Sequence, residues 1–143
     1  MPSATRTVTI NRPIDEVFAF FTTPFNDKKW RRHVKEIKAP GPLEVGTRIH
    51  QLVAGPRGRG IRAHIEVTRI DPPNAYDFRV VAGPIRPHGE FRLRPDGEGT
   101  EVTLTLSAAI GGLKGRLMER PVQKSMEIEV AGLETAKRVI ESS

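Results

Sequence analysis

The chain has 143 residues and a formal net charge of +6, and it contains no cysteine, which excludes disulfides and thiolate metal sites. Hydrophobic residues make up 37% and charged residues 28% of the sequence, a composition typical of a globular protein with a sizeable core. No apolar run approaches the roughly 20 residues that span a bilayer and the N-terminus does not resemble a signal peptide, so we expect one domain, residues 1–143, in the cytoplasm.

The N-terminal part of the chain predicts a strand followed by two short helices. Residues 5–10 alternate apolar and polar side chains, which is the pattern of a half-buried strand. Pro13 suits the first turn of a helix, and apolar residues then recur at helical spacing over residues 14–21 until a Thr-Thr-Pro stop. A second short turn, residues 25–29, leads into Trp30, the only tryptophan.

The middle of the chain predicts a run of antiparallel strands that share one apolar face. Stretches that alternate apolar and polar residues are separated by turns rich in glycine and proline. These stretches are residues 47–54, 61–68, 76–80, 88–94 and 101–108. Two polar side chains, Gln51 and Tyr76, share the inward register of their strands, and either could bind a carbonyl or hydroxyl group of a ligand.

The last stretch, residues 113–140, predicts one long amphipathic helix. Apolar side chains recur there at steps of three or four residues and form one stripe. The stripe consists of Met118, Val122, Met126, Val130, Leu133, Ala136 and Ile140. Such a stripe packs against an apolar surface, and the preceding strands provide one. Because Pro121 falls inside the stretch, the helix either kinks there or begins there.

Three stretches of the sequence share the motifs of one known superfamily. They are TVTINRPIDEVFAFFTTPFNDKKW at residues 7–30, LEVGT at residues 43–47 and VTRIDPP at residues 67–73. In the first stretch, a strand leads to a Pro-x-x-x-Val helix and a short second helix that ends in tryptophan. The matching residues are Pro13, Val17, Phe18, Phe20, Phe21 and Trp30. Together with the last helix, these motifs resemble the START-like (SRPBCC) superfamily, which includes polyketide cyclase/dehydrase-like proteins and the plant pathogenesis-related allergens.

The resemblance implies an α+β helix-grip fold. In this fold a curved antiparallel sheet of six to seven strands wraps round a long C-terminal helix, and two short helices follow the first strand. The arrangement encloses a pocket for an apolar ligand, and we expect the inward side chains to line it. The expected lining residues are Phe21, Trp30, His33, Ile49, Gln51, Val53, Ala63, Ile65, Tyr76, Phe78, Phe91, Leu104, Leu106, Met118, Val122 and Met126.

The sequence therefore predicts a binding or carrier module for a small hydrophobic or amphipathic molecule, such as a lipid, with no cofactor. No paired carboxylates lie at expected inward positions, the histidines lack metal-ligand spacing, and no nucleophile or phosphate-binding motif occurs. We accordingly assign no catalytic residue and no metal ligand. The alternative that the resemblance implies is a polyketide cyclase, aromatase or dehydrase-like enzyme that acts on a ligand in the same cavity.

Three basic clusters support a third hypothesis, a regulatory or partner-binding module. The clusters are residues 28–32 around Trp30, residues 57–62, and the series Arg116, Arg120 and Lys124 on one helix face. Nucleic acid is not the expected partner, because only one aromatic side chain is interleaved and no nucleic-acid motif is present. An acidic protein, a membrane surface or an acidic ligand tail fits these clusters better. We expect a monomer or a homodimer.

Overall fold

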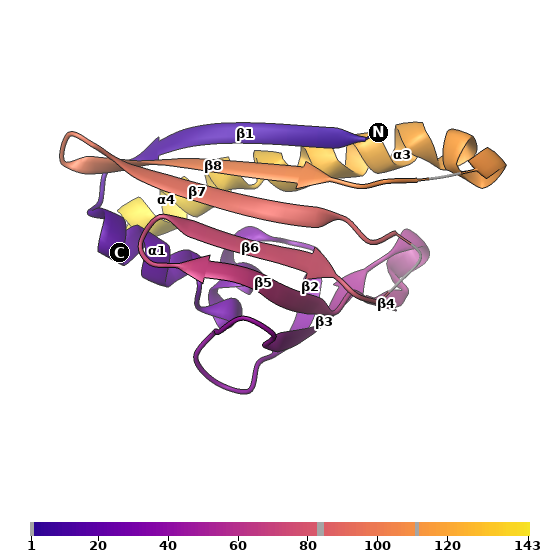
Figure 1. The fold of residues 1–143 in the computed structure, drawn as a ribbon, viewed down its shortest axis with the longest axis horizontal. Coiled ribbons are helices and arrows are strands. Elements are labelled where there is room, and N and C mark those ends of the chain that lie inside the picture. Colours follow the sequence, from indigo (N-terminus) through magenta and orange to yellow (C-terminus); the bar gives the residue numbers. More distant parts are fainter. Residues whose placement is uncertain (1, 83–84, 111) are drawn as a thin grey trace.

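A curved antiparallel sheet and two C-terminal helices form this α+β fold, seen in a computed structural model that describes residues 2–82, 85–110 and 112–143 (Figure 1). The strands are β1 (Ser3–Ile10), β2 (Val34–Lys38), β3 (Arg48–Ala54), β4 (Gly60–Arg62), β5 (Ile65–Asp71), β6 (Ala75–Val80), β7 (His88–Asp96) and β8 (Gly99–Ser107). Seven strands follow the order β1-β8-β7-β6-β5-β3-β2, and the short β4 also pairs with β3. The predicted fold class, with six to seven strands in a curled sheet, is confirmed.

One strand predicted as continuous is interrupted. The alternating stretch at residues 61–68 forms two strands, β4 and β5, which both pair with β3. Leu52 of β3 lies opposite Arg62, whereas Ile49 lies opposite Ile65. The residues between the two strands, Ala63 and His64, leave the regular ladder while the side-chain alternation continues. The sequence pattern alone therefore could not reveal the break.

Two short helices follow β1, as predicted. Helix α1 spans Ile14–Phe21, and a short 3-10 turn, η1 (Pro24–Asn26), leads into α2 (Asp27–Trp30). Pro13 lies at the N-cap of α1 in an extended conformation, one position before its expected place inside the first turn. Because the apolar side chains of α1 face the sheet, the helix covers one end of the core (Figure 1).

The C-terminal helix consists of two consecutive segments, α3 (Gly112–Ala131) and α4 (Leu133–Glu141), separated by Gly132. The apolar stripe faces inward from Val122 to Ile140, and every stripe residue in this range is buried. Met118 is the exception, because 40% of its surface is exposed. Since α3 begins at Gly112, Pro121 lies inside the helix, and the alternative that the helix begins at Pro121 is wrong.

The C-terminal helices lie along β1, one edge of the sheet (Figure 1). The Ser3 amide donates to Gln123 Oε1 at 2.9 Å, and Gln123 Nε2 donates to the Ser3 carbonyl at 2.7 Å. Near the other end of the strand, the Asn11 amide donates to Glu141 Oε2 at 2.8 Å. An unpaired strand edge is a template for aggregation. These helix side chains form hydrogen bonds with some of the unpaired backbone groups along the edge at β1.

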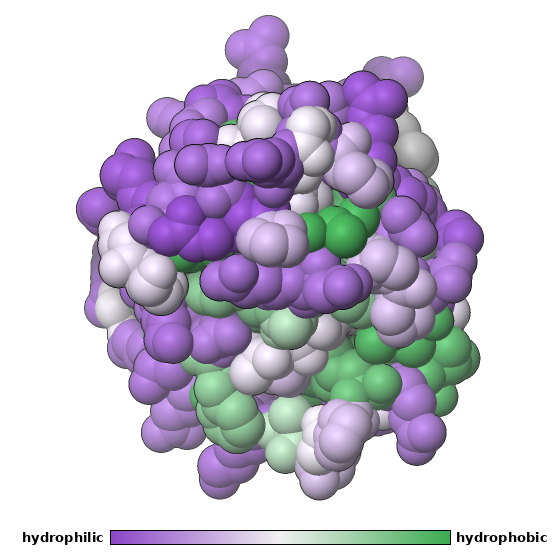
Figure 2. All heavy atoms as spheres, turned by 90° about the vertical axis from the view of Figure 1, so that its left-hand side faces the viewer, coloured by the Kyte–Doolittle hydropathy of each residue, from purple (hydrophilic) through white to green (hydrophobic). Residues whose placement is uncertain are grey.

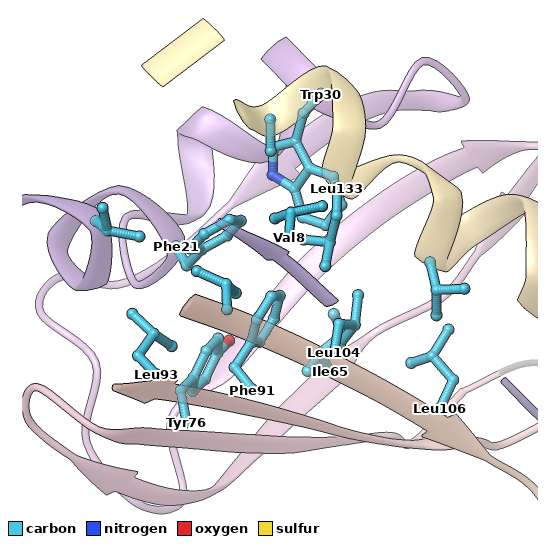
Figure 3. Close-up of a cluster of buried hydrophobic side chains, with 14 of the residues drawn as sticks. Val8, Phe21, Trp30, Ile65, Tyr76, Phe91, Leu93, Leu104, Leu106 and Leu133 are labelled. Carbon is cyan, nitrogen blue, oxygen red and sulfur yellow. The ribbon is translucent and has the colours of Figure 1, made fainter. Parts of the chain in front are cut away.

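The core lies between the concave face of the sheet and the helices (Figure 3). Its centre is aromatic: the ring of Phe91 stacks on Tyr76 at a centroid distance of 5.7 Å and packs against Phe21 at 4.9 Å. Trp30 meets Phe21 edge to face, and Leu133 of α4 is fully buried beside this group. Because these side chains point toward one another, the short helices, the sheet and the C-terminal helix share one core.

The end of the molecule that carries α1 and the C-terminus faces the viewer in Figure 2. Hydrophilic residues cover the upper part of this end, and hydrophobic residues gather on one side of its lower part. The other end of the molecule carries the beginning of α3, where Leu113 is 81% and Leu117 is 78% exposed (Figure 1).

Candidate functional site

A cavity of about 490 Å³ lies between the concave face of the sheet and α3. This volume falls in the range of roughly 300–1,000 Å³ that is common for small-molecule sites. Phe21, Trp30, Tyr76 and Phe91 form its aromatic inner wall (Figure 3). The lining also includes exposed residues such as Ala54 at the end of β3, so the cavity opens there to solvent.

The structure places the predicted lining residues at the cavity wall with two exceptions. Ile49 is buried in the core away from the cavity, and Met118 lies outside it on the exposed first part of α3. The residues that do line the cavity are Phe21, Trp30, His33, Gln51, Val53, Ala63, Ile65, Tyr76, Phe78, Phe91, Leu104, Leu106, Val122 and Met126. Contact of these side chains with a ligand stays a prediction.

Trp30 is buried in the wall of the cavity and does not lie at its rim. Only 4% of its surface is exposed, and a Cβ atom added to Gly132 would lie 3.2 Å from Trp30 Cε3. The break between α3 and α4 therefore coincides with the place where the indole packs against the helix backbone.

One wall of the cavity is charged. Arg31 follows α2 directly, and its side chain is only 13% exposed. Its Nε donates to Glu129 of α3, while its Nη1 donates to Asp27 Oδ2 at 3.3 Å and to Gln51 Oε1 at 3.1 Å. The other Glu129 oxygen lies 2.9 Å from Nε2 of His33. All five of these side chains line the cavity.

The two carboxylates of this charged wall have opposite pKa shifts. Burial raises the pKa of Asp27 from 3.8 to about 6, and its pairing with Arg31 offsets this only in part. Burial would also raise the pKa of Glu129, but Arg31 and His33 outweigh it and lower the value from 4.5 to about 2. The difference follows from geometry, since Glu129 binds two basic groups and Asp27 only one. Near neutral pH, Asp27 is therefore the carboxylate closest to its titration range.

Two neighbouring aromatic side chains belong to the same polar environment. The indole N–H of Trp30 lies near enough to Asp27 to lower its pKa, but no acceptor among the described residues meets full hydrogen-bond geometry with Trp30 Nε1. Burial, with a smaller contribution from the Asp27 charge, raises the pKa of the Tyr76 hydroxyl. Tyr76 is thus a neutral phenol over the whole physiological range.

Sequence reasoning missed the charged members of this wall. The neighbouring lysines and arginine predict an exposed position for Arg31, which is wrong, and no inward carboxylate was expected where Asp27 and Glu129 lie. One signal was available for Glu129: it follows Met126 by three positions and precedes Leu133 by four, so it lies on the buried face of the helix. For Asp27 and Arg31 the signal was weaker, an i, i+4 pair of opposite charge that flanks the buried Trp30.

The histidines outside the cavity have no grouping that indicates a metal site. His64 Nδ1 accepts a hydrogen bond from the backbone N–H of Gln51 at 3.3 Å, and its ring packs edge to face on His50. Partial burial and the neighbouring His50, Arg62 and Arg48 lower the pKa of His64. Within the described parts of the chain, no three histidine or carboxylate side chains are arranged to hold a metal ion. None of the described helices is both long enough and apolar enough to cross a membrane.

Comparisons with known proteins agree with this architecture. The family model described as "Polyketide cyclase / dehydrase and lipid transport" matches residues 1–138. The crystal structure of TTHA0849 from Thermus thermophilus is similar with a TM-score of 0.80 at 22% identity, covering 99% of this chain and 98% of that one. The crystal structure of a conserved protein from Geobacillus kaustophilus is similar with a TM-score of 0.73 at 24% identity, covering 99% of this chain and 96% of that one.

A third solved structure, CalU16 from Micromonospora echinospora, gives a TM-score of 0.66 at 22% identity, covering 96% of this chain and 75% of that one. At identities this low, the likeness to solved structures shows the shared fold alone. No sequence among the curated proteins is significantly similar to this chain.

Proposed function

We propose, from the premise that this chain belongs to the polyketide cyclase/dehydrase and lipid transport family, that it is a single START-like domain which binds a small apolar or amphipathic molecule. The ligand occupies the cavity between the sheet and α3. The protein acts as a carrier or binding module for this molecule.

The observation that supports this proposal is the division of the cavity wall. Apolar side chains from the sheet and from α3 form most of it, and the polar groups are gathered at one place around Arg31. An apolar cavity with a few convergent polar groups is the usual form of a small-molecule site. The apolar part would hold the body of the ligand, and the polar part would fix its orientation.

Filling the cavity tests the proposal directly. Val122 and Met126 are buried on the inner face of α3 and line the cavity. N-phenylnaphthylamine, a neutral dye that fluoresces in apolar sites, should bind the wild-type protein with micromolar affinity or better, and Val122→Trp or Met126→Trp should abolish binding. Ile128→Trp is the matched control, because Ile128 lies on the same helix but is exposed.

Thermal unfolding of each variant separates a filled cavity from an unfolded chain. If both buried variants fold and still bind the dye as the wild type does, the cavity under α3 is not the binding site. If only the buried variants lose the dye, native mass spectrometry of protein purified from its own host should identify the ligand that the cavity retains.

A second candidate function is a cyclase or dehydrase-like enzyme, and one observation favours it. Asp27 lines the cavity and has a pKa of about 6, which suits a group that accepts and returns a proton near neutral pH. If the protein is such an enzyme, Asp27→Asn should bind a linear polyketone without converting it, whereas the wild type should cyclise it or release water. Mass spectrometry of the reaction mixture distinguishes the two outcomes.

A further inference from the structure

Gln51 presents a hydrogen-bond donor to the cavity. A guanidinium group only donates hydrogen bonds, so the Gln51 atom 3.1 Å from Arg31 Nη1 must be the carbonyl oxygen Oε1. The amide Nε2 of Gln51 therefore points away from Arg31. Among the described residues no acceptor forms a hydrogen bond with this Nε2, although Gln51 is buried and lines the cavity.

Arg31 offers further donors from the same place. Its Nε and Nη1 are occupied by Glu129, Asp27 and Gln51, whereas its Nη2 has no hydrogen-bond acceptor in the described part of the chain. Among the described residues, the buried side-chain polar atom without a partner is Trp30 Nε1, so these two donors are not enclosed. A ligand that supplies an acceptor can therefore reach them. Tyr76, drawn in Figure 3, also lines the cavity, and its hydroxyl group can donate a further hydrogen bond.

The positive charge of Arg31 is already neutralised, and this restricts which kind of acceptor group a ligand can place there. Two carboxylates, Glu129 and Asp27, bind the single guanidinium of Arg31 inside the cavity wall. A ligand carboxylate would meet the donors of Arg31 but would also be repelled by both acidic groups, whose side chains are largely buried and so only weakly screened. An uncharged carbonyl oxygen would meet the same donors without that repulsion.

We propose that the cavity selects an uncharged apolar molecule that carries a carbonyl oxygen, seated against Gln51 and Arg31, and that Asp27 and Glu129 exclude molecules that end in a carboxylate. This inference rests on the proposed binding function and adds the chemical class of the ligand. A ketone, an ester or a lactone belongs to the selected class, whereas a free fatty acid does not.

A pair of ligands with the same chain length tests the inference. Decyl methyl ketone and dodecanoate each have a long apolar chain and differ in the charge of the polar end. Both should be measured by displacement of N-phenylnaphthylamine at about pH 8, where the fatty acid is ionised. The ketone should bind the wild-type protein at least about tenfold more tightly than dodecanoate.

Charge-removing variants show whether the two carboxylates cause the selectivity. Glu129→Gln keeps the size of the side chain and removes one negative charge, so dodecanoate should gain about tenfold in affinity relative to the ketone. Asp27→Asn removes the other negative charge and should change the affinity ratio in the same direction. It provides the test if Glu129→Gln does not fold. Glu134→Gln is the matched control, because Glu134 lies on the next helix in an exposed pair with Arg6 and should leave the ratio unchanged.

The donor is tested by Gln51→Met, which keeps the length of the side chain and removes its amide. The ketone should then lose affinity relative to the neutral dye. Equal or tighter binding of dodecanoate to the wild type, or a ratio that neither charge variant changes, would overturn the inference while the binding function stands. If the dye itself does not bind the wild type, the proposed function fails, and the inference fails with it.

Discussion

The ring of Phe78 covers Gly89, the residue that faces it across strands β6 and β7. A Cβ atom added to Gly89 would lie 2.2 Å from Phe78 Cζ, far inside the roughly 3.5 Å at which carbon atoms attract one another. Because Phe78 also lines the cavity, the missing side chain at Gly89 determines where the ring lies and how wide the cavity is there.

Gly89→Ala should therefore change both stability and binding. The new methyl group forces the Phe78 ring out of its place, which should cost about 1–3 kcal/mol of unfolding free energy and weaken dye binding as the ring enters the cavity. Urea unfolding and dye titration measure the two effects. The control is the double variant with Phe78→Leu, which should recover part of the loss, because the smaller side chain can avoid the methyl group. Additive effects of the two substitutions would contradict the proposed contact.

Trp30 should contribute strongly to stability because it is buried against Phe21, Phe91 and Gly132. Trp30→Ala should lower the unfolding free energy by about 3–5 kcal/mol, whereas Trp30→Phe retains a ring and should cost much less. Thermal or urea unfolding measures both variants. A Trp30→Ala protein that melts at the wild-type temperature would show that the indole is not packed in the core.

Pro121 should destabilise α3, because a proline in the interior of a helix removes one backbone hydrogen bond and clashes with the carbonyl of Leu117, four residues earlier. Pro121→Ala should therefore raise the unfolding free energy by up to about 3 kcal/mol. If the proline also bends α3 so that Val122 leaves room for the ligand, the same substitution should weaken dye binding. Lower stability of the alanine variant together with unchanged dye binding would contradict both expectations.

Asp27 should make the protein less stable as the pH rises. Its pKa is about 6 in the folded chain against 3.8 for an ordinary aspartate, so the folded state binds more protons between these values. Stability must then fall from about pH 4 to about pH 6, by roughly 3 kcal/mol for this group. Asp27→Asn should remove this fall and be more stable than the wild type at neutral pH. Urea unfolding of the wild type and of Asp27→Asn at a series of pH values between about 4 and 6 measures the difference in unfolding free energy. A difference that stays constant over this range would contradict the prediction.

Glu129 should have the opposite effect, because its pKa is lowered from 4.5 to about 2 in the folded chain. Its contribution to stability is complete above about pH 4.5 and is lost as the pH falls toward 2. Glu129→Gln should therefore cost roughly 3 kcal/mol near neutral pH and progressively less in acid, which urea unfolding at a series of pH values measures. If the variant were as stable as the wild type at neutral pH, the ion pairs with Arg31 and His33 would contribute no net stability.

Some elements could be predicted from the sequence because their signals are local. The alternation in residues 101–108 and the stripe from Val122 to Ile140 depend only on the period of a strand or a helix, and both elements are observed. Gln51 and Tyr76 could be assigned to the cavity in the same way, from their register in β3 and β6. The expected partner of the basic clusters stays a prediction.

The charged wall of the cavity was decided by the tertiary structure. Arg31 and Glu129 are separated by 98 positions in the chain, and only the packing of α2 against the C-terminal helices, where it contacts α4, brings them together. A basic residue in a cluster of basic residues is exposed in most proteins, so the local sequence around Arg31 predicted the wrong environment. The period of a strand or helix determines which side of an element a residue occupies, whereas the identity of the groups that meet inside the cavity depends on the path of the whole chain.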